Sequence, residues 1–295
     1  MIDVAILSAI RDRLAQAFAI DETRYHPLVV DRVRLGWLDD DRFARLAQFN
    51  DVFRVADGVA TFVAPLSDCN ARSAAMADIA QALRAEGALP AWRNETYAVA
   101  SEFDAPPAFH LERGAARWFG VRTWAAHVNG LVHDNGDLRM WFARRSPTKA
   151  VDAGLFDNLV GGGIAAGMRV DATVVKEAWE EAGIAAHVAR RARPSGAVHV
   201  RRNMFDGLER ETLFVHDLAL PKDFVPANQD REAVGHRLVD LTEAARLIAQ
   251  DGTSDDVTID ASVVVLDCLL RHGAIAPDAP GYIPLASLRF SAADW

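Results

Sequence analysis

The sequence has few cysteines and no long apolar run, and each absence excludes a class of protein. Its 295 residues include two cysteines, Cys69 and Cys268, which do not form a CxxC motif. We therefore expect neither a disulfide framework nor a cysteine-based zinc site, and a reducing cytoplasm is the predicted location. The apolar run near the C-terminus, residues 261–270, contains Asp267 and is too short to span a bilayer.

Basic residues are outnumbered by acidic ones. The chain has 32 Lys and Arg residues against 41 Asp and Glu residues, so its formal net charge is −9. This balance argues against nucleic acid and anionic membranes as primary partners, because both carry dense negative charge. It does not argue against a phosphorylated small molecule, because a bound divalent cation inverts the local charge.

The length and the pattern predict two domains, the first of which is a smaller α+β domain over residues 1–120. Its helices and its hairpin are predicted over residues 1–20, 70–87 and 52–63. The hairpin turns at Asp57-Gly58, a pair suited to positive φ angles. Asn70 is the expected cap of the second helix and Gly87 its terminator.

The remainder, residues 121–295, predicts an α/β domain in which a mixed sheet lies between helices. A second hairpin turns at Asn135-Gly136. Further strands are expected around residues 155–163, 196–202, 212–220 and 234–241, and closing helices over residues 241–252 and 260–273.

Three glutamates lie close together in the segment GGGIAAGMRVDATVVKEAWEEAGI, residues 161–184. A helix is expected from near Asp171 to Gly183, which suits the left-handed position that ends a helix. At 100° per residue the three glutamates share one face of this helix. They are Glu177, Glu180 and Glu181. Their charges repel, no basic residue follows four positions along, and Lys176 is expected on a neighbouring face.

A divalent cation would relieve the repulsion among these glutamates. Mg²⁺ prefers hard oxygen ligands and keeps some waters that a phosphate can replace. The glycine-rich stretch before the helix would let the backbone approach the ion and the phosphates closely. The plainer alternative is a solvated helix face, and the glycine-rich entry together with the preceding strand favours the metal site.

The segment resembles the Nudix box, which reads Gly, five residues, Glu, seven residues, Arg-Glu, a hydrophobic residue, any residue, Glu-Glu, any residue, Gly and a hydrophobic residue. The match runs from Gly162 to Ile184 with every element in register. Two positions depart from it, since Met168 replaces the first Glu and Lys176 replaces Arg. The resemblance implies the Nudix fold, an α/β/α sandwich, for residues 121–295, and the hydrolysis of a diphosphate joined to another group.

The resemblance also implies roles for the matching residues. The implied metal ligands are Glu177, Glu180, Glu181 and the carbonyl of Gly161, with Mg²⁺ as the expected ion and Mn²⁺ as the alternative. Glu177 either binds metal or orients the attacking water, and Glu180 is a central ligand. Lys176 would orient a box glutamate through its charge, without the bidentate geometry of Arg. Met168 removes a peripheral ligand, so fewer metal ions than usual are expected.

A general base in this family often comes from a loop outside the box. Glu232, in the segment 228–241, is the candidate for that base or for an additional ligand. An acid on a surface loop is an equally good interpretation of Glu232.

Three stretches outside the box are similar to those of one Nudix subgroup. They are residues 125–132, 140–167 and 214–232. The subgroup carries an extra N-terminal domain and includes the Nudix part of fungal thiamine pyrophosphokinase fusions. Its members hydrolyse thiamine diphosphate and, preferentially, its damaged oxy and oxo forms to monophosphates. A small-molecule diphosphate of this kind is therefore the implied substrate.

Substrate contacts are expected before the box. Arg144 and Arg145 follow a strand, and one of them can meet the terminal phosphate; a surface pair is the alternative, and it is favoured for Arg145. His127 and Asn129 share one face of a strand and can line a pocket between the domains. A buried, hydrogen-bonded histidine is an equal alternative.

Two other functions stay open. Because one fold serves many substrates, the chain could be a Nudix pyrophosphatase for ADP-sugars or dinucleotides. Met168 and Lys176 also allow a diphosphate-binding module that does not turn its ligand over. The N-terminal domain could complete the pocket, form a homodimer, or do both.

Overall fold

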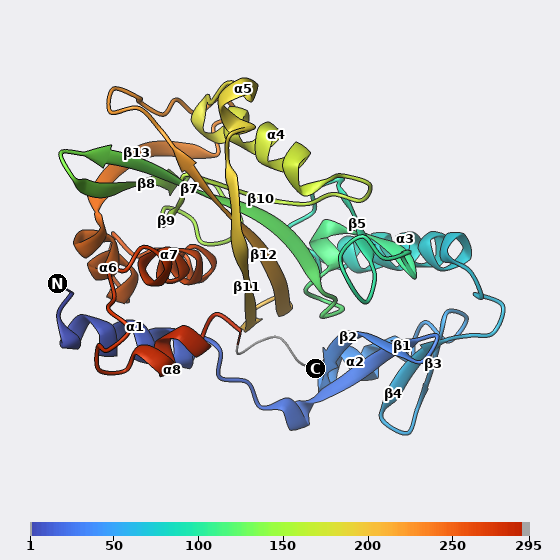
Figure 1. Ribbon diagram of the computed structural model, residues 1–295. Coiled ribbons are helices and arrows are strands. Elements are labelled where there is room, and N and C mark those ends of the chain that lie inside the picture. The colour runs from blue at the N-terminus through green and yellow to red at the C-terminus, as the bar shows by residue number, and fades with distance from the viewer. Residues whose placement is uncertain (1, 291–295) are drawn as a thin grey trace.

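A mixed sheet of seven strands forms the centre of the C-terminal part of the molecule (Figure 1). The computed structural model describes residues 2–290. The strands are β7 (Thr123–Asp134), β8 (Asp137–Arg145), β9 (Phe156–Asn158), β10 (Val160–Gly163), β11 (Arg193–Met204), β12 (Gly207–Ala219) and β13 (Ala233–Asp240). The order is β11-β12-β7-β8-β13, while β10 pairs with β7 and β9 with β8. β7 runs parallel to β12 and antiparallel to β8 and β10, so it is the central strand.

Helices cover both faces of this sheet (Figure 1). They are α4 (Val170–Ala182), α5 (Ala186–Ala189), α6 (Leu241–Ala249) and α7 (Ile259–Arg271). Val174 and Ala178 of α4 share a core cluster with Ala126, whereas α6 and α7 share the opposite cluster with Ala125. Successive strand residues point to opposite faces, so β7 contributes to both layers. The expected α/β/α sandwich is confirmed.

The N-terminal part has its own sheet, with strand order β2-β1-β4-β3, and its own core. Its elements are η1 (Glu22–Arg24), β1 (Tyr25–Val30), β2 (Val33–Asp39), α2 (Asp40–Leu46), β3 (Phe53–Ala56), β4 (Val59–Phe62) and α3 (Cys69–Ala85). The hairpin of β5 (Thr96–Val99) and β6 (Phe109–Glu112) and the short helix η2 (Arg113–Ala115) then lead to β7. The expected α+β character of this part is confirmed.

Both predicted hairpin turns are confirmed. Asp57 and Gly58 have φ angles of 52° and 74°, and Asn135 and Gly136 have φ angles of 51° and 95°. Positive φ at both central residues matches the right-handed twist of the strands that the turn connects.

The cap predicted for α3 was wrong. The N-cap is Asp68, whose carboxylate accepts a hydrogen bond from the Ala71 N–H at 2.9 Å. Because α3 begins at Cys69, Asn70 already lies inside its first turn. Gly87 follows the end of the helix with φ +79°, as expected of its terminator.

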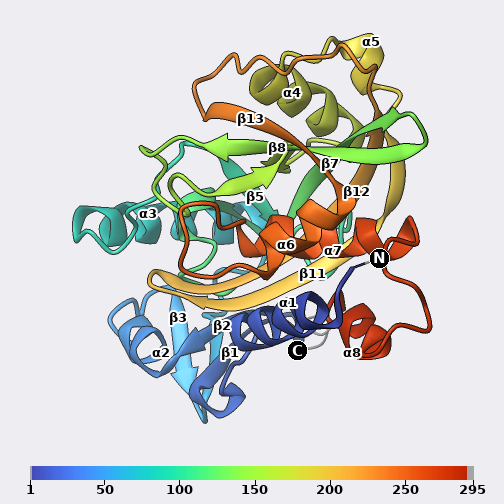
Figure 2. The same cartoon turned by 90° about the vertical axis from the view of Figure 1, so that its left-hand side faces the viewer.

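The first helix, α1 (Val4–Ala17), packs against the C-terminal part of the molecule (Figure 2). Its buried residues are Leu7, Ile10 and Leu14, and they join the core of α6 and α7. Arg13 fastens the helix there by donating to the carbonyls of Ile248 at 3.0 Å and Val257 at 2.5 Å. A short helix, α8 (Tyr282–Ser287), lies beside α1. The chain therefore begins in the core of its second half.

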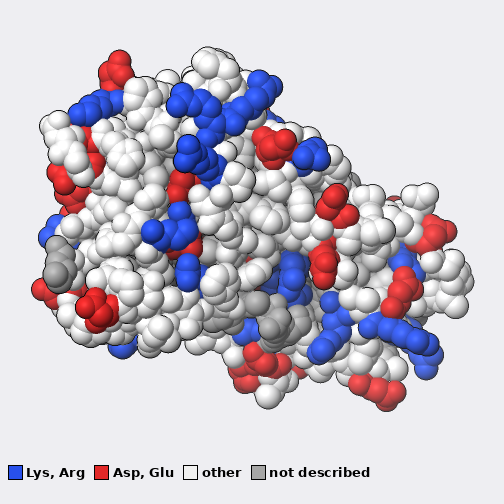
Figure 3. Space-filling model, in the orientation of Figure 1, with Lys and Arg blue, Asp and Glu red and all other residues white. Residues whose placement is uncertain are grey.

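The charged side chains on the face seen in Figure 3 are interspersed, with acidic and basic groups side by side. Within residues 2–290, no helix is both long enough and apolar enough to cross a membrane.

Truncating α1 at its buried face should weaken the C-terminal core. Leu14 is fully buried, so Leu14→Ala should lower the free energy of unfolding by about 2–5 kcal/mol. Val4, on the same helix, is 54% exposed, and Val4→Ala should change it by less than about 0.5 kcal/mol. Urea unfolding midpoints check both values, and equal midpoints for the two variants would refute the assignment of α1 to this core.

Candidate active site

The C-terminal end of α4 is closed by a loop from residues 224–232. Gly183 has φ +65°, and a Cβ there would lie 2.7 Å from the Ala227 carbonyl oxygen. The Gln229 N–H donates to the Glu180 carbonyl at 2.7 Å. Glycine is therefore required at the end of α4, and the loop is held against the helix that carries the glutamates.

Two of the glutamates contact the glycines of β10. Glu181 accepts a hydrogen bond from the Gly161 N–H at 2.8 Å. Glu177 lies against Gly162, where a Cβ would lie 2.8 Å from the Glu177 Oε1. The bare backbone of β10 is what lets these carboxylates approach the strand.

Lys176 forms ion pairs with two of the three glutamates, Glu177 and Glu180. Its Nζ lies 2.8 Å from Glu177 Oε1 and 3.0 Å from Glu180 Oε2. Although partial burial opposes it, these two hydrogen bonds raise the pKa of Lys176 above its ordinary value. The prediction that Lys176 lies on a neighbouring face was wrong, because Glu180 follows it at the favourable four-residue spacing.

Glu181 is buried next to other carboxylates. Burial raises its pKa to about 8, the carboxylates of Asp157 and Glu177 add to the effect, and the Gly161 N–H opposes it. Several carboxylates thus share a site in which water cannot stabilise all of their charges.

The donor set suits a hard divalent cation. Carboxylate oxygens are the ligands that such ions prefer. The N–H and C=O of a strand residue point to the same edge, so the Gly161 carbonyl faces the side where its N–H meets Glu181. The groups that would hold the ion are therefore Glu177, Glu180, Glu181 and the Gly161 carbonyl.

Met168 lies in the turn before α4 and is 37% exposed. Its thioether is a soft donor and a poor ligand for a hard cation. The site therefore lacks the peripheral carboxylate that the box pattern has at this position.

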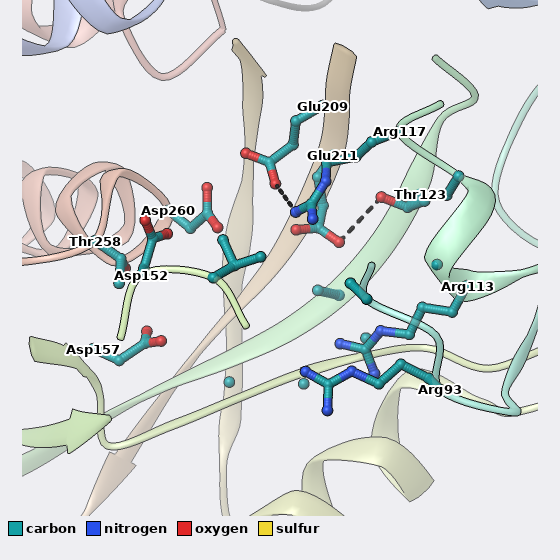
Figure 4. Close-up of a pocket in the computed structure, with 18 of the residues that line it drawn as sticks. Arg93, Arg113, Arg117, Thr123, Asp152, Asp157, Glu209, Glu211, Thr258 and Asp260 are labelled. Atoms are coloured by element: carbon teal, nitrogen blue, oxygen red, sulfur yellow. Dashed lines mark hydrogen bonds and ion pairs between the residues drawn. The ribbon is translucent and has the colours of Figure 1, made fainter. Parts of the chain in front are cut away.

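A polar cavity opens on the other side of β10 (Figure 4). About 160 Å³ of it is accessible to the centres of water molecules. Figure 4 shows Arg93 and Arg113 at one end, the acids Asp152 and Asp260 at the other, and Glu211 between them. The cavity therefore has a cationic end and a carboxylate end, at which Asp152 and Asp260 lie around the single guanidinium of Arg202.

The glycines of β10 form the wall between this cavity and α4. A Cβ on Gly161 would lie 2.9 Å from His127 Cε1, and one on Gly163 would lie 3.4 Å from Arg113 Cζ. Gly162 faces Glu177 instead, so the strand alternates between the two sides. The three glutamates do not line the cavity itself, but only the width of a side-chain-free strand separates them from it.

His127 lines the cavity, and Asn129 does not. The His127 imidazole is 2.8 Å from Asn158 Oδ1 through its Nδ1. Asn129 is fully buried, accepts from Asn158 Nδ2 at 3.3 Å and donates to Asp217 Oδ1 at 3.0 Å. The two predicted residues therefore belong to one buried polar chain, of which His127 alone reaches the cavity.

Arg144 and Arg145 point to opposite sides of β8. Arg145 lines the cavity and donates to Asp157 at 2.7 Å. Arg144 instead donates to Asp255 at 2.5 Å and stacks over the Phe156 ring. The structure therefore does not bring Arg144 to the predicted substrate site, because strand alternation turns it away.

Glu232 forms an ion pair with Lys149, and Lys149 lies close enough to Glu181 for the two charges to interact. Burial and the nearby Arg145 lower the pKa of Lys149 to about 8, while Glu181 opposes this shift. Glu232 is half-exposed and lies in a groove with Lys149 that adjoins the cavity. Its role as a base stays a prediction.

Several polar residues of the cavity were not predicted. They are Arg93, Tyr97, Arg113, Asp157, Glu209, Glu211 and Asp260, with Lys149 in the adjoining groove. Apart from Glu209 and Glu211, which alternate along β12, they come from separate segments, so no local motif marks the set. Lys149 and Asp157 lie in a stretch, residues 140–167, that the sequence had singled out for another reason.

Two family models match consecutive parts of the chain. The domain of unknown function DUF4743 matches residues 7–123, and the NUDIX domain matches residues 123–260. The chain is 37% identical to Nudix hydrolase 24, chloroplastic, of Arabidopsis thaliana over 88% of this chain and 71% of that protein. Nudix hydrolase 20, chloroplastic, of the same plant is 35% identical over the same shares of both chains. The crystal structure of DR0079 from Deinococcus radiodurans is 20% identical, with a TM-score of 0.41 over 58% of this chain and 97% of that chain.

A side chain on Gly162 should displace Glu177 and weaken metal binding. Gly162→Ala places a methyl group against the Glu177 carboxylate, so affinity for Mn²⁺ should fall about 10- to 100-fold, as for other disturbed metal-site neighbours. Gly235→Ala is the control, since a Cβ there meets no atom within 4 Å. Calorimetric Mn²⁺ titration measures the effect, and equal affinities in the two variants would contradict the assigned site.

Proposed function

Because this chain belongs to the Nudix hydrolase family, we propose that it is a Mg²⁺-dependent diphosphatase that cleaves thiamine diphosphate analogues. Nudix hydrolases act on pyrophosphate bonds and generally use divalent metal ions. Such an ion, held by the glutamates of α4, would neutralise phosphate charge and activate a water. The proposed substrates are the oxy and oxo forms of thiamine diphosphate, and the products are the monophosphate and phosphate.

The observation that carries this proposal is the carboxylate end of the cavity. Glu211 accepts a hydrogen bond from Thr123 Oγ1 at 3.1 Å. Asp260 Oδ1 is buried and has no hydrogen-bond partner among the described residues, and its nearest cation, Arg202, is 3.8 Å away. Burial, followed by the charge of Glu209, raises the pKa of both acids. This end of the cavity therefore favours a ligand that brings positive charge or polar ring atoms.

A thiamine analogue has the groups that such a cavity end can recognise. An ionised carboxylate attracts a cationic thiazolium ring and accepts from an amino group, whereas a protonated carboxyl donates to a ring oxygen. Oxythiamine carries the cationic thiazolium ring and an exocyclic oxygen in place of the pyrimidine amino group. The oxo form has a neutral thiazolone ring and keeps the amino group, from which a carboxylate can accept a hydrogen bond. The neutral purine of an ADP-sugar would add no positive charge to that of Arg202 at this end of the cavity.

The residues around the glutamates have proposed supporting roles. Lys176 holds Glu177 and Glu180 together, and Glu232 is the proposed general base, kept in place by Lys149. We also propose a cytoplasmic location, from the scarcity of cysteine. The two plant relatives are named as chloroplastic.

A substrate panel tests the proposal directly. With Mg²⁺, phosphate release should show the highest kcat/KM for oxythiamine diphosphate, followed by thiamine diphosphate. ADP-ribose and NADH, assayed with a coupled phosphatase, should be poor substrates. AMP as the main product would favour the ADP-sugar or dinucleotide function, and diphosphate binding without turnover would favour a binding module.

Removing one charge from the glutamate cluster should abolish most activity. Glu180→Gln should lower kcat on the order of 10²-fold or more, because it removes a group that stabilises charge during the reaction. Asp171→Asn, an exposed acid on the same helix, is the matched control and should keep near wild-type kcat. Steady-state kinetics check both, and an unaffected Glu180→Gln variant would disprove the site assignment.

Asp260→Asn should impair binding of the cationic ring. We expect KM for oxythiamine diphosphate to rise about tenfold with little change in kcat, because a buried charge partner is lost. The raised pKa means that Asp260 ionises only as the pH rises, so wild-type KM should fall with increasing pH and the variant should show a weaker trend. The exposed Asp251→Asn is the control. A variant with the wild-type pH profile of KM would exclude Asp260 as the ring partner.

A further inference from the structure

We propose that the N-terminal domain completes the active site, and that its Arg93 binds the terminal phosphate of the diphosphate substrate. This inference rests on the proposed diphosphatase function. It assigns a role in substrate binding to a part of the chain that matches a domain of unknown function.

The hairpin of β5 and β6 is hydrogen-bonded directly to the loop before α4. The Ala166 N–H donates to the Thr96 carbonyl at 2.8 Å. Tyr97 and Arg113 lie against Gly163, where a Cβ would lie 3.0 Å from Tyr97 Cζ. The segment that precedes and includes β5 is therefore fixed relative to the metal-binding glutamates.

The backbone of Arg93 is held in place, while its guanidinium is free. The Arg93 N–H donates to Glu112 Oε1 at 2.8 Å, and the neighbouring Trp92 indole donates to Asn94 Oδ1 at 2.7 Å. Arg84 stacks over the Trp92 ring at 4.5 Å. Among residues 2–290, the Arg93 guanidinium has no hydrogen bond or ion pair, and Figure 4 shows it pointing into the cavity beside Arg113.

The other cations around it are already paired. Arg113 donates to Glu95 at 2.6 Å, Arg145 donates to Asp157 at 2.7 Å, and Lys149 pairs with Glu232. Burial, together with the charges of Arg113 and Arg145, lowers the pKa of Arg93. An anionic ligand would offset this repulsion, and a guanidinium can bind phosphate oxygens in a bidentate manner.

The position of Arg93 indicates which phosphate it meets. Arg93 lines both the polar cavity and the adjoining groove that contains Lys149 and Glu232. Of the carboxylates proposed to bind the ring, Asp260 lies at the opposite end of the cavity and Glu211 lies between the two ends (Figure 4). A diphosphate that extends from a ring held there points its terminal phosphate towards Arg93.

The test compares Arg93→Ala and Arg93→Lys with Arg54→Ala, an exposed arginine of β3 that lies outside the cavity. We expect Arg93→Ala to raise KM for oxythiamine diphosphate about 10- to 100-fold, as for the loss of a hydrogen bond to a charged group. Arg93→Lys should recover part of the loss, and Arg54→Ala should match the wild type. Urea unfolding midpoints confirm that each variant is folded.

A binding measurement separates this inference from the proposed function. Methylenediphosphonate, which cannot be hydrolysed, is titrated into each protein with Mg²⁺ by calorimetry. Loss of affinity in Arg93→Ala alone supports the inference, even if the wild type turns over none of the thiamine compounds. The inference is overturned if Arg93→Ala and the wild type bind with equal affinity, or if the wild type does not bind. Phosphate release by the wild type would still support the proposed function in either case.

Discussion

Three consecutive glycines in β10 are the constraint on which the site depends. Each lacks the side chain that would keep a neighbouring element away, so α4 reaches one side of the strand while His127 and the N-terminal hairpin reach the other. The same bare backbone offers an N–H to Glu181, and the Gly161 carbonyl is the backbone ligand proposed for the cation. The glutamate cluster, the cavity and the contact between the two halves of the chain therefore meet on one short strand.

The sequence predicted the features that local rules decide. The Asn135-Gly136 turn and the glutamate helix that ends at Gly183 follow from backbone preferences and periodicity, and both were found. The position of Lys176 was predicted wrongly, because Glu180 follows it by four residues and the two side chains pair on one face of the helix.

The rest of the site depends on tertiary contacts that no local pattern contains. Alternation along β8 shows that Arg144 and Arg145 face opposite ways, but only the packing of the neighbouring elements determines which of them meets the cavity. Arg93 and Asp260 are far apart in sequence and become neighbours of one cavity only when the hairpin and α7 both dock on the sheet. Their shared position at this cavity therefore cannot be predicted from local sequence patterns.

The packing of α1 has a consequence for how the chain folds. The hydrogen-bond partners of Arg13 lie 235 to 249 residues later in the chain. The rest of the N-terminal domain therefore lies in sequence between α1 and the core against which α1 packs. Closing such a long loop is entropically costly, and contacts of this separation form slowly. During synthesis, the apolar face of α1 must wait for α6 and α7 to leave the ribosome, while the intervening domain can already fold. Although α1 is made before the N-terminal domain, it is thus buried after that domain has had time to fold, and its apolar face stays open to a chaperone during this interval.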